Sequence, residues 1–198
     1  METRLFILLI LITSLKLNGQ VSGYPKGVYA NISELRDKQP SAQHDVIIEK
    51  RTIGDIRMNG GNDYKIISKD ASIKKSVFKK EIFAYSTGDS LFLNCFTLKI
   101  QPWYTLILKM HNDDLIFSAA MSSSDAGAYA YMGGAIGGAI AATKRHLYTL
   151  DISSGKLQRM CITKMNTLLS DSPLLKEKYN LEVDKAEDEI FLKYINQL

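Results

Sequence analysis

The sequence is poor in the residues and motifs that are typical of enzyme active sites. Its 198 residues include three histidines, two cysteines and one tryptophan. The histidines, His44, His111 and His146, stand far apart in the chain, and no HExxH, Cys-x-x-Cys, nucleophile-elbow or phosphate-binding-loop motif occurs. The sequence therefore predicts no catalytic residues, no metal ligands and no cofactor.

Two weaker patterns have more ordinary explanations. His111 beside Asp113 and Asp114 could touch a cation, but the composition of this stretch is that of a solvated turn, which is the interpretation we prefer. Three S-x-x-K matches lack the partner motifs of serine–lysine hydrolases and are expected by chance in a chain rich in serine and lysine. They begin at Ser72, Ser76 and Ser153.

A strong excess of one charge is also absent. The formal net charge is +4 and the mean hydropathy is −0.08, so the chain has no basic stripe of the kind that binds nucleic acid. One basic concentration consists of Lys65, Lys69, Lys74, Lys75, Lys79 and Lys80. We interpret it as a solvated face. Weak attraction to anionic lipid headgroups or polysaccharide is the alternative.

The first 23 residues predict a cleaved secretory signal peptide. Arg4 precedes an apolar core, Leu5–Leu15, that is too short for a permanent anchor, and a polar exit with small residues follows. Cleavage is expected after Gly19 or Gly23, with an uncleaved anchor as the alternative. Residues 24–198 are then long enough for a single domain with a real core, exported to the periplasm or cell surface.

The two cysteines, Cys95 and Cys161, would enter an oxidising compartment if the chain is exported. A disulfide between them would close a long loop and stabilise the fold by about 4 kcal/mol in the chain-entropy model. Two buried free thiols are the alternative, and the sequence does not decide between the two.

Residues 126–143, AGAYAYMGGAIGGAIAAT, are the least ordinary stretch of the chain. On a helix, small residues would recur every fourth position and form a face for close packing, which includes Ala130, Gly133, Gly134, Gly137 and Gly138. A helix of this length would span about 27 Å, slightly less than a hydrocarbon core. Few of its residues are strongly apolar, and glycine disfavours a helix.

We therefore expect residues 126–143 to form a helix or helical hairpin packed tightly inside the domain. Its small-residue face could also receive a protein partner or a second copy of the chain. A membrane span is a less favoured alternative, and a flexible Gly/Ala-rich connection is another.

The middle of the chain consists of short β-like runs separated by turn residues, which predicts an antiparallel meander of roughly seven to nine strands and an α+β fold. The expected strands are Val46–Arg51, Asp55–Met58, Tyr64–Ser68, Ile82–Ser86, Ser90–Phe96, Trp103–Met110, Leu115–Met121, Leu147–Ile152 and Leu157–Cys161.

Helices are expected near both ends of this sheet-forming region. Asn31 is a good N-cap for a short helix, and the tail continues with a helical piece over Ile162–Leu169. Ser172 followed by proline predicts the start of a second tail helix. Asp184 and Glu187 resemble a capping box in front of a last, amphipathic helix, which should dock on the sheet together with the glycine segment.

Three stretches of the sequence resemble a family of small exported Bacteroidota proteins that is defined as a domain of unknown function. They are Gly27–Leu35 with Pro40-Ser41, Glu81–Asn94, and the Gly-rich piece before Leu150–Lys156. The resemblance implies export by a signal ending before Gln20, and it implies no catalytic residues. No cysteine follows the apolar core directly, so the lipoprotein route does not apply. Asp89-Ser90-Leu91 also resembles the short O-glycosylation site of that phylum.

Together these observations favour a non-enzymatic envelope or interaction protein. An exported, hydrolase-like enzyme is one alternative, and a cleft that gathers Asp113, Asp114 and a histidine would favour it. An integral membrane protein anchored through residues 126–143 is another. A disulfide between Cys95 and Cys161 would exclude that arrangement, because the span would separate the two thiols.

Overall fold

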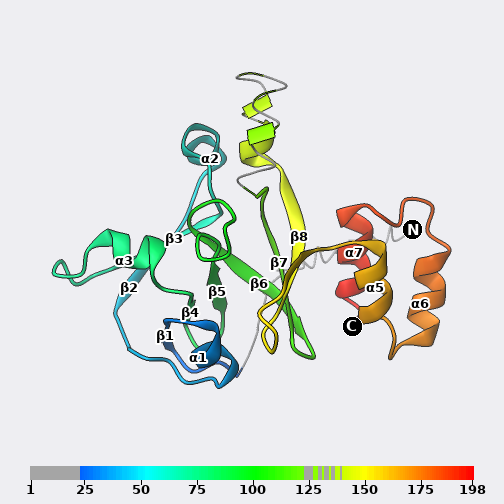
Figure 1. Cartoon of the computed structure of the whole chain (residues 1–198), viewed down its shortest axis with the longest axis horizontal. Coiled ribbons are helices and arrows are strands. Elements are labelled where there is room, and N and C mark those ends of the chain that lie inside the picture. Colours follow the sequence, from blue (N-terminus) through cyan, green and yellow to red (C-terminus); the bar gives the residue numbers. More distant parts are fainter. Residues whose placement is uncertain (1–22, 123–126, 129–130, 132–133, 135–136, 139) are drawn as a thin grey trace, which may run out of the picture.

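The computed structural model describes residues 23–122, 127–128, 131, 134, 137–138 and 140–198 (Figure 1). The predicted signal peptide thus lies outside the described residues, apart from Gly23. Ala130 and Gly133 of the predicted small-residue face lie outside them too.

Nine strands form one antiparallel sheet, and short helices lie at its ends and on its face (Figure 1). This confirms the predicted α+β class. The strands are β1 (Gly27–Tyr29), β2 (Val46–Lys50), β3 (Tyr64–Ser68), β4 (Ala84–Ser86), β5 (Leu91–Asn94), β6 (Tyr104–His111), β7 (Asp114–Ala120), β8 (Arg145–Asp151) and β9 (Leu157–Arg159). The helices are α1 (Ile32–Arg36), α2 (Ile53–Asn59), α3 (Lys75–Lys80), α5 (Ile162–Leu168), α6 (Pro173–Asn180) and α7 (Asp188–Ile195).

The sheet is a meander from β4 to β9 with a fork at β6. Its main order is β1-β4-β5-β6-β7-β8-β9, while β2 and β3 form a separate ribbon that joins β6 through the single pair Tyr64↔Tyr104. Tyr104 also pairs with Asn94 of β5, and β7 pairs with β6 from Ile107 onward. Strands β3 and β7 therefore leave the same edge of β6 in different directions.

The core follows from the alternation of side chains along the strands. On β7, Leu115 and Phe117 are fully buried in one apolar cluster with β4, β5 and α1, whereas Ile116 is fully buried in another. The second cluster contains Met165 of α5, Tyr179 of α6 and Phe191 of α7, among others. The three tail helices thus cover one face of β7 and β8, as the sequence predicts.

The expected strand over Asp55–Met58 is wrong, because this stretch lies in helix α2. The Thr52 hydroxyl accepts a hydrogen bond from the Asp55 amide at 3.1 Å, which caps the helix. Ile53 and Ile56 then lie one turn apart, and Ile56 is buried. A four-residue alternation is too short to distinguish a strand from one turn of helix.

The predicted caps are confirmed in part. The Asn31 side chain caps α1 by accepting a hydrogen bond from the Glu34 amide at 3.0 Å. Pro173 opens α6, but its N-cap Ser172 makes no side-chain capping bond. The predicted capping box of Asp184 with Glu187 is wrong. Glu187 occupies the N-cap position of α7, and its side chain makes no capping hydrogen bond.

Of the two alternatives that the sequence leaves open for Cys95 and Cys161, the structure has no disulfide between them. Both thiols are free; Cys95 is fully buried in the core, while Cys161 is exposed in front of α5. Cys95 directly follows β5 and Cys161 lies just after β9, and four strand spacings amount to roughly 19 Å. A disulfide needs Cα atoms within about 7 Å. The alternative of two buried thiols fits Cys95 only.

The glycine segment connects β7 to β8, and its described residues, 127–128, 131, 134, 137–138 and 140–143, are all helical. At Gly134 the φ of +55° departs from right-handed helical geometry. Gly134 is exposed, Gly137 is buried and Gly138 is half-buried. The use of this face for packing or for a partner stays a prediction. Among the residues that the structure describes, no helix has the length and apolar character needed to cross a membrane.

Candidate functional site

Two hollows lie at the two ends of β3, one polar and one apolar. The polar pocket includes Ser68, the last residue of the strand, and the apolar pocket includes Asp63, which directly precedes the first. We describe the polar pocket first because more ionisable side chains line it than line the apolar pocket.

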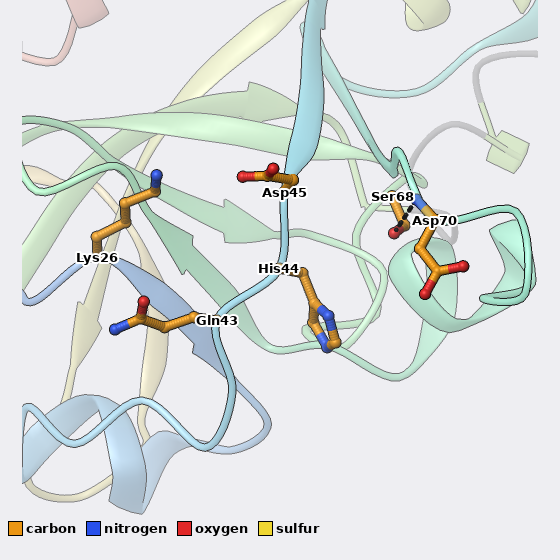
Figure 2. Close-up of a pocket in the computed structure, with 6 residues that line it drawn as sticks. All are labelled: Lys26, Gln43, His44, Asp45, Ser68 and Asp70. Carbon is orange, nitrogen blue, oxygen red and sulfur yellow. Dashed lines mark hydrogen bonds between the residues drawn. The ribbon is translucent and has the colours of Figure 1, made fainter.

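The polar pocket has a volume of about 400 Å³ and is lined by Lys26, Gln43, His44, Asp45, Ser68 and Asp70. Figure 2 shows Lys26 and Gln43 on one side, Ser68 and Asp70 on the other, and His44 and Asp45 between them on the segment that enters β2. Most of these side chains are exposed. The pocket is therefore an open hollow that presents charges of both signs.

Local turn bonds occupy the groups that would otherwise be reactive. The Ser68 hydroxyl accepts the amide N–H of Asp70 at 3.0 Å (Figure 2). The Asp70 carboxylate accepts the amide N–H of Ser72 at 2.9 Å. Hydrogen bonds from Ser72 hold the pKa of Asp70 below its usual range, with a smaller contribution from His44. His44 packs edge-on against Phe78, with ring centroids 6.0 Å apart. Among these described side chains no hydrogen bond joins Ser68 to His44, as an activated serine would require.

The apolar pocket lies between α2 and the residues that lead into β8. It has a volume of about 240 Å³ and is lined by Ile53, Ile56, Asp63, Thr143 and Arg145. Ile56 forms the buried wall, but 68% of Ile53 is exposed to solvent.

A second exposed aliphatic side chain lies one helical turn from Thr143 of this pocket. Ile140 is 51% exposed and precedes Thr143 by three residues in the helical stretch, so both side chains lie on the same side of the helix. We call Ile53, Ile56, Ile140 and Thr143 the apolar patch.

An ion pair fixes the rim of the apolar pocket. The Arg145 guanidinium donates to the Asp63 carboxylate at 2.7 and 3.1 Å, and both side chains are partly buried. Arg145 also donates to the carbonyls of Gly61 and Ala142, at 3.2 and 3.1 Å. One side chain therefore ties together the loop before β3, the end of the glycine segment and β8.

A second arginine supports the same loop from beneath. The Arg51 side chain is only 3% exposed and donates to the carbonyls of Gly60 and Asn62, at 2.8 and 2.9 Å. It also forms an ion pair with Asp55 of α2. Gly61 has a φ of +91°, and a Cβ at this position would lie 2.8 Å from an Arg51 nitrogen, so glycine is required here.

Asn62 forms hydrogen bonds across the fork of the sheet, where β3 and β7 separate. It is fully buried, and its side-chain amide donates to the Gln101 carbonyl at 2.7 Å while its oxygen accepts the Ala120 amide N–H at 2.7 Å. The backbone N–H of Asn62 donates to the Pro102 carbonyl at 2.8 Å. This single side chain thus connects the start of β3 with the end of β7 and the entry to β6.

The turn that contains His111, Asp113 and Asp114 is not part of either pocket. His111 and Asp114 are opposite each other in the β6–β7 pair, and Asp114 accepts a hydrogen bond from Lys164 of α5 at 2.6 Å. Within the described ranges of the chain, no three His, Cys, Asp or Glu side chains gather in a way that could hold a metal ion.

The six-lysine concentration is only partly a freely solvated face. Lys65 of β3 and Lys79 of α3 lie over the ring of Trp103, at 5.9 and 5.1 Å from its centroid. Lys65 also forms an ion pair with Glu49 at 3.5 Å. These two lysines therefore help to pack α3 and the β2–β3 ribbon around the tryptophan.

Sequence reasoning missed the apolar patch. Its residues come from two segments about ninety positions apart, and Ile53 was assigned to no element. The spacing Thr52-x-x-Asp55 could have indicated α2, because a hydroxyl three residues before an acidic residue is a helix-start signal. Nothing in the sequence indicates that α2 lies beside Thr143.

The chain belongs to a family of unknown function. The model of that family, described as "Family of unknown function (DUF6563)", matches residues 27–198, which is most of the sequence. No curated protein and no solved structure matches the chain. The resemblance to a family of unknown function is thus confirmed, while the placement of that family in Bacteroidota and its export stay predictions.

Proposed function

We propose that this protein is an exported, non-catalytic interaction protein of the cell envelope, and that a protein partner binds at the apolar patch. The observation that carries the proposal is the exposure of Ile53 at a hollow whose rim is held by the Arg145–Asp63 pair, with the exposed Ile140 one helical turn from the lining residue Thr143. Export is supported by the sequence of residues 1–23.

The chemistry of the patch favours a partner that inserts an aliphatic or aromatic side chain. Burying a fully exposed isoleucine contributes about 1.5–3 kcal/mol. Ile53 and Ile140 are 68% and 51% exposed, so each would contribute a part of that amount to binding. The pocket walls come from a capped helix and from segments fixed by buried arginine hydrogen bonds. Such a preorganised surface loses little conformational entropy when it is covered.

The polar pocket supports this function less well. Its charged side chains are mostly exposed, so their interactions with a ligand would be screened by water and salt. Its serine and aspartate are already engaged in turn bonds. The apolar patch, in contrast, has exposed side chains that gain free energy when a partner removes them from water.

Site-specific photo-crosslinking in cells tests the proposal. A photoreactive phenylalanine analogue replaces Ile53 in one variant and Leu174 in the control, because Leu174 of α6 is also a strongly exposed aliphatic residue, at 78%. We expect a discrete crosslinked product from position 53 that is absent at position 174. The same products from both positions, or none from position 53, would show that the patch does not bind a partner.

Export is tested separately by cell fractionation with determination of the mature N-terminus. We expect the protein in the soluble envelope fraction and an N-terminus near Gln20 or Tyr24. A cytoplasmic protein that retains Met1 would contradict the proposed export. The proposed binding at the apolar patch would still be tested by the crosslinking experiment.

A further inference from the structure

Strand β2 presents an open edge that differs from the edges at β1 and β9, the two ends of the main strand order. β2 pairs with β3 on one side, and no strand of the described chain pairs with its other side. The β1 edge, in contrast, is covered by backbone bonds of Val28 to Ser41 and Ala42. The β9 edge is three residues long, whereas β2 has five residues and an Ile47 that is 47% exposed.

The hydrogen-bond pattern defines which groups of β2 are available. The Asp45 carbonyl accepts the Lys69 amide at 2.9 Å, and the Arg51 amide donates to the Asp63 carbonyl at 2.8 Å. Since partners alternate along an antiparallel pair, the odd-numbered residues of β2 face β3. The backbone N–H and C=O groups of Val46, Ile48 and Lys50 therefore point outward, where a further strand could bond them.

We propose that this edge pairs with β2 of a second copy of the chain, antiparallel and about a two-fold axis through Ile48. Ile48 then faces Ile48 of the partner subunit, and Val46 faces Lys50 of the partner subunit. These three residues exchange both of their outward hydrogen bonds in each pair. The result is a four-stranded ribbon, β3-β2-β2-β3, that joins the two sheets.

The sequence of the strand is complementary to itself in this orientation. Its two charged residues, Glu49 and Lys50, face the aliphatic Ile47 and Val46 of the other copy, so no like charges stand opposite each other. Parallel pairing in register would place Glu49 against Glu49 of the partner subunit, which is destabilising. Glu49 is in addition neutralised by Lys65 at 3.5 Å on its own chain. For a second copy of the chain, the charges therefore favour the antiparallel over the parallel orientation.

The pairing requires no rearrangement of the fold. Val46 and Ile48 keep their packing against the cluster around Phe78 and Ile66, because that packing involves side chains and the new bonds involve only the backbone. Ile47 and Glu49 project from the other face of the ribbon. The proposed interface is distinct from the apolar patch, so it stands independently of the proposed function.

Sedimentation equilibrium of the purified protein and of two proline variants tests the proposal. Ile48→Pro removes an amide that points outward, so it blocks the edge without breaking a β2–β3 bond. Arg159→Pro is the matched control on β9, because the Met160 amide bonds to Leu147 and the Arg159 amide therefore also points outward. We expect twice the chain mass for the native protein and Arg159→Pro, and the single chain mass for Ile48→Pro.

Cysteine crosslinking keeps the test decisive if a proline variant does not fold. In a Cys161→Ser background, which removes the exposed native thiol, Ile48→Cys should form a disulfide-linked or short-linker dimer, whereas Arg159→Cys should not. A native protein that stays monomeric at its highest soluble concentration overturns the proposal. So does a dimer that persists in Ile48→Pro, or one that crosslinks equally from both edges.

Discussion

The buried side chain of Asn62 allows a quantitative prediction about the fork of the sheet. In Asn62→Ala the Ala120 amide and the Gln101 carbonyl each lose a partner that lies 2.7 Å away. A buried polar group left unpaired costs about 1–3 kcal/mol, so we expect the free energy of unfolding to fall by about 4 kcal/mol. The Pro102 carbonyl keeps a hydrogen-bond partner in the variant, because it also accepts the backbone N–H of residue 62.

Urea unfolding monitored by fluorescence measures this loss. The protein has a single tryptophan, Trp103, which lies beside the loop that carries Asn62. Asn59→Ala is the control, because Asn59 is exposed and its side chain bonds only to Asp55 on the surface, so the loss should be below about 0.5 kcal/mol. If Asn62→Ala costs less than about 1 kcal/mol, comparable with an ordinary surface change, the assignment of Asn62 as the link between β3 and β7 is refuted.

Three further predictions concern single positions. Gly61→Ala should lower the free energy of unfolding in urea by more than about 2 kcal/mol, because the new Cβ would lie 2.8 Å from a backbone atom and a side-chain atom. Gly88 has a similar positive φ but open space around it, so Gly88→Ala should lower the free energy of unfolding by only about 1 kcal/mol. Burial lowers the pKa of His146, so the folded state resists protonation, and the free energy of unfolding should fall as the pH drops below about 6.5. His146→Gln should reduce this dependence of the free energy of unfolding on pH. An unchanged dependence would exclude His146 as its origin. Cys161 should react with a thiol reagent in the folded protein. Cys95, whose pKa is raised by burial, should react only after unfolding. A folded protein with no reactive thiol would contradict the exposed, free thiol of Cys161.

The features that the sequence predicted well are local. Asn31 caps α1 through a bond to an amide three residues away, and Pro173 begins α6, because capping preferences act within one turn of chain. Most strands lie near their predicted positions, because runs of apolar, β-branched and aromatic residues between turn residues mark them in the sequence.

The features that the sequence did not predict depend on distant contacts or on very short patterns. Helix α2 was taken for a strand because Asp55–Met58 alternates by chance over four residues. Helix α3 was seen only as part of a lysine-rich run, and its packing over Trp103 follows from the fold. The apolar patch needs Ile53 and Thr143 to meet, and no periodicity carries that information.

The fork at β6 also has a consequence for the order in which the chain folds. Strands β6 to β9 pair between neighbours in sequence, so loop closure costs little conformational entropy for most of the meander. The link from Asn62 to Ala120 spans 58 residues, and β3 meets β6 through one residue pair. Contacts of such long sequence separation form slowly. We therefore expect the meander to fold first and the β2–β3 ribbon to dock late, so that the open edge of β2 is completed only when the rest of the sheet already exists.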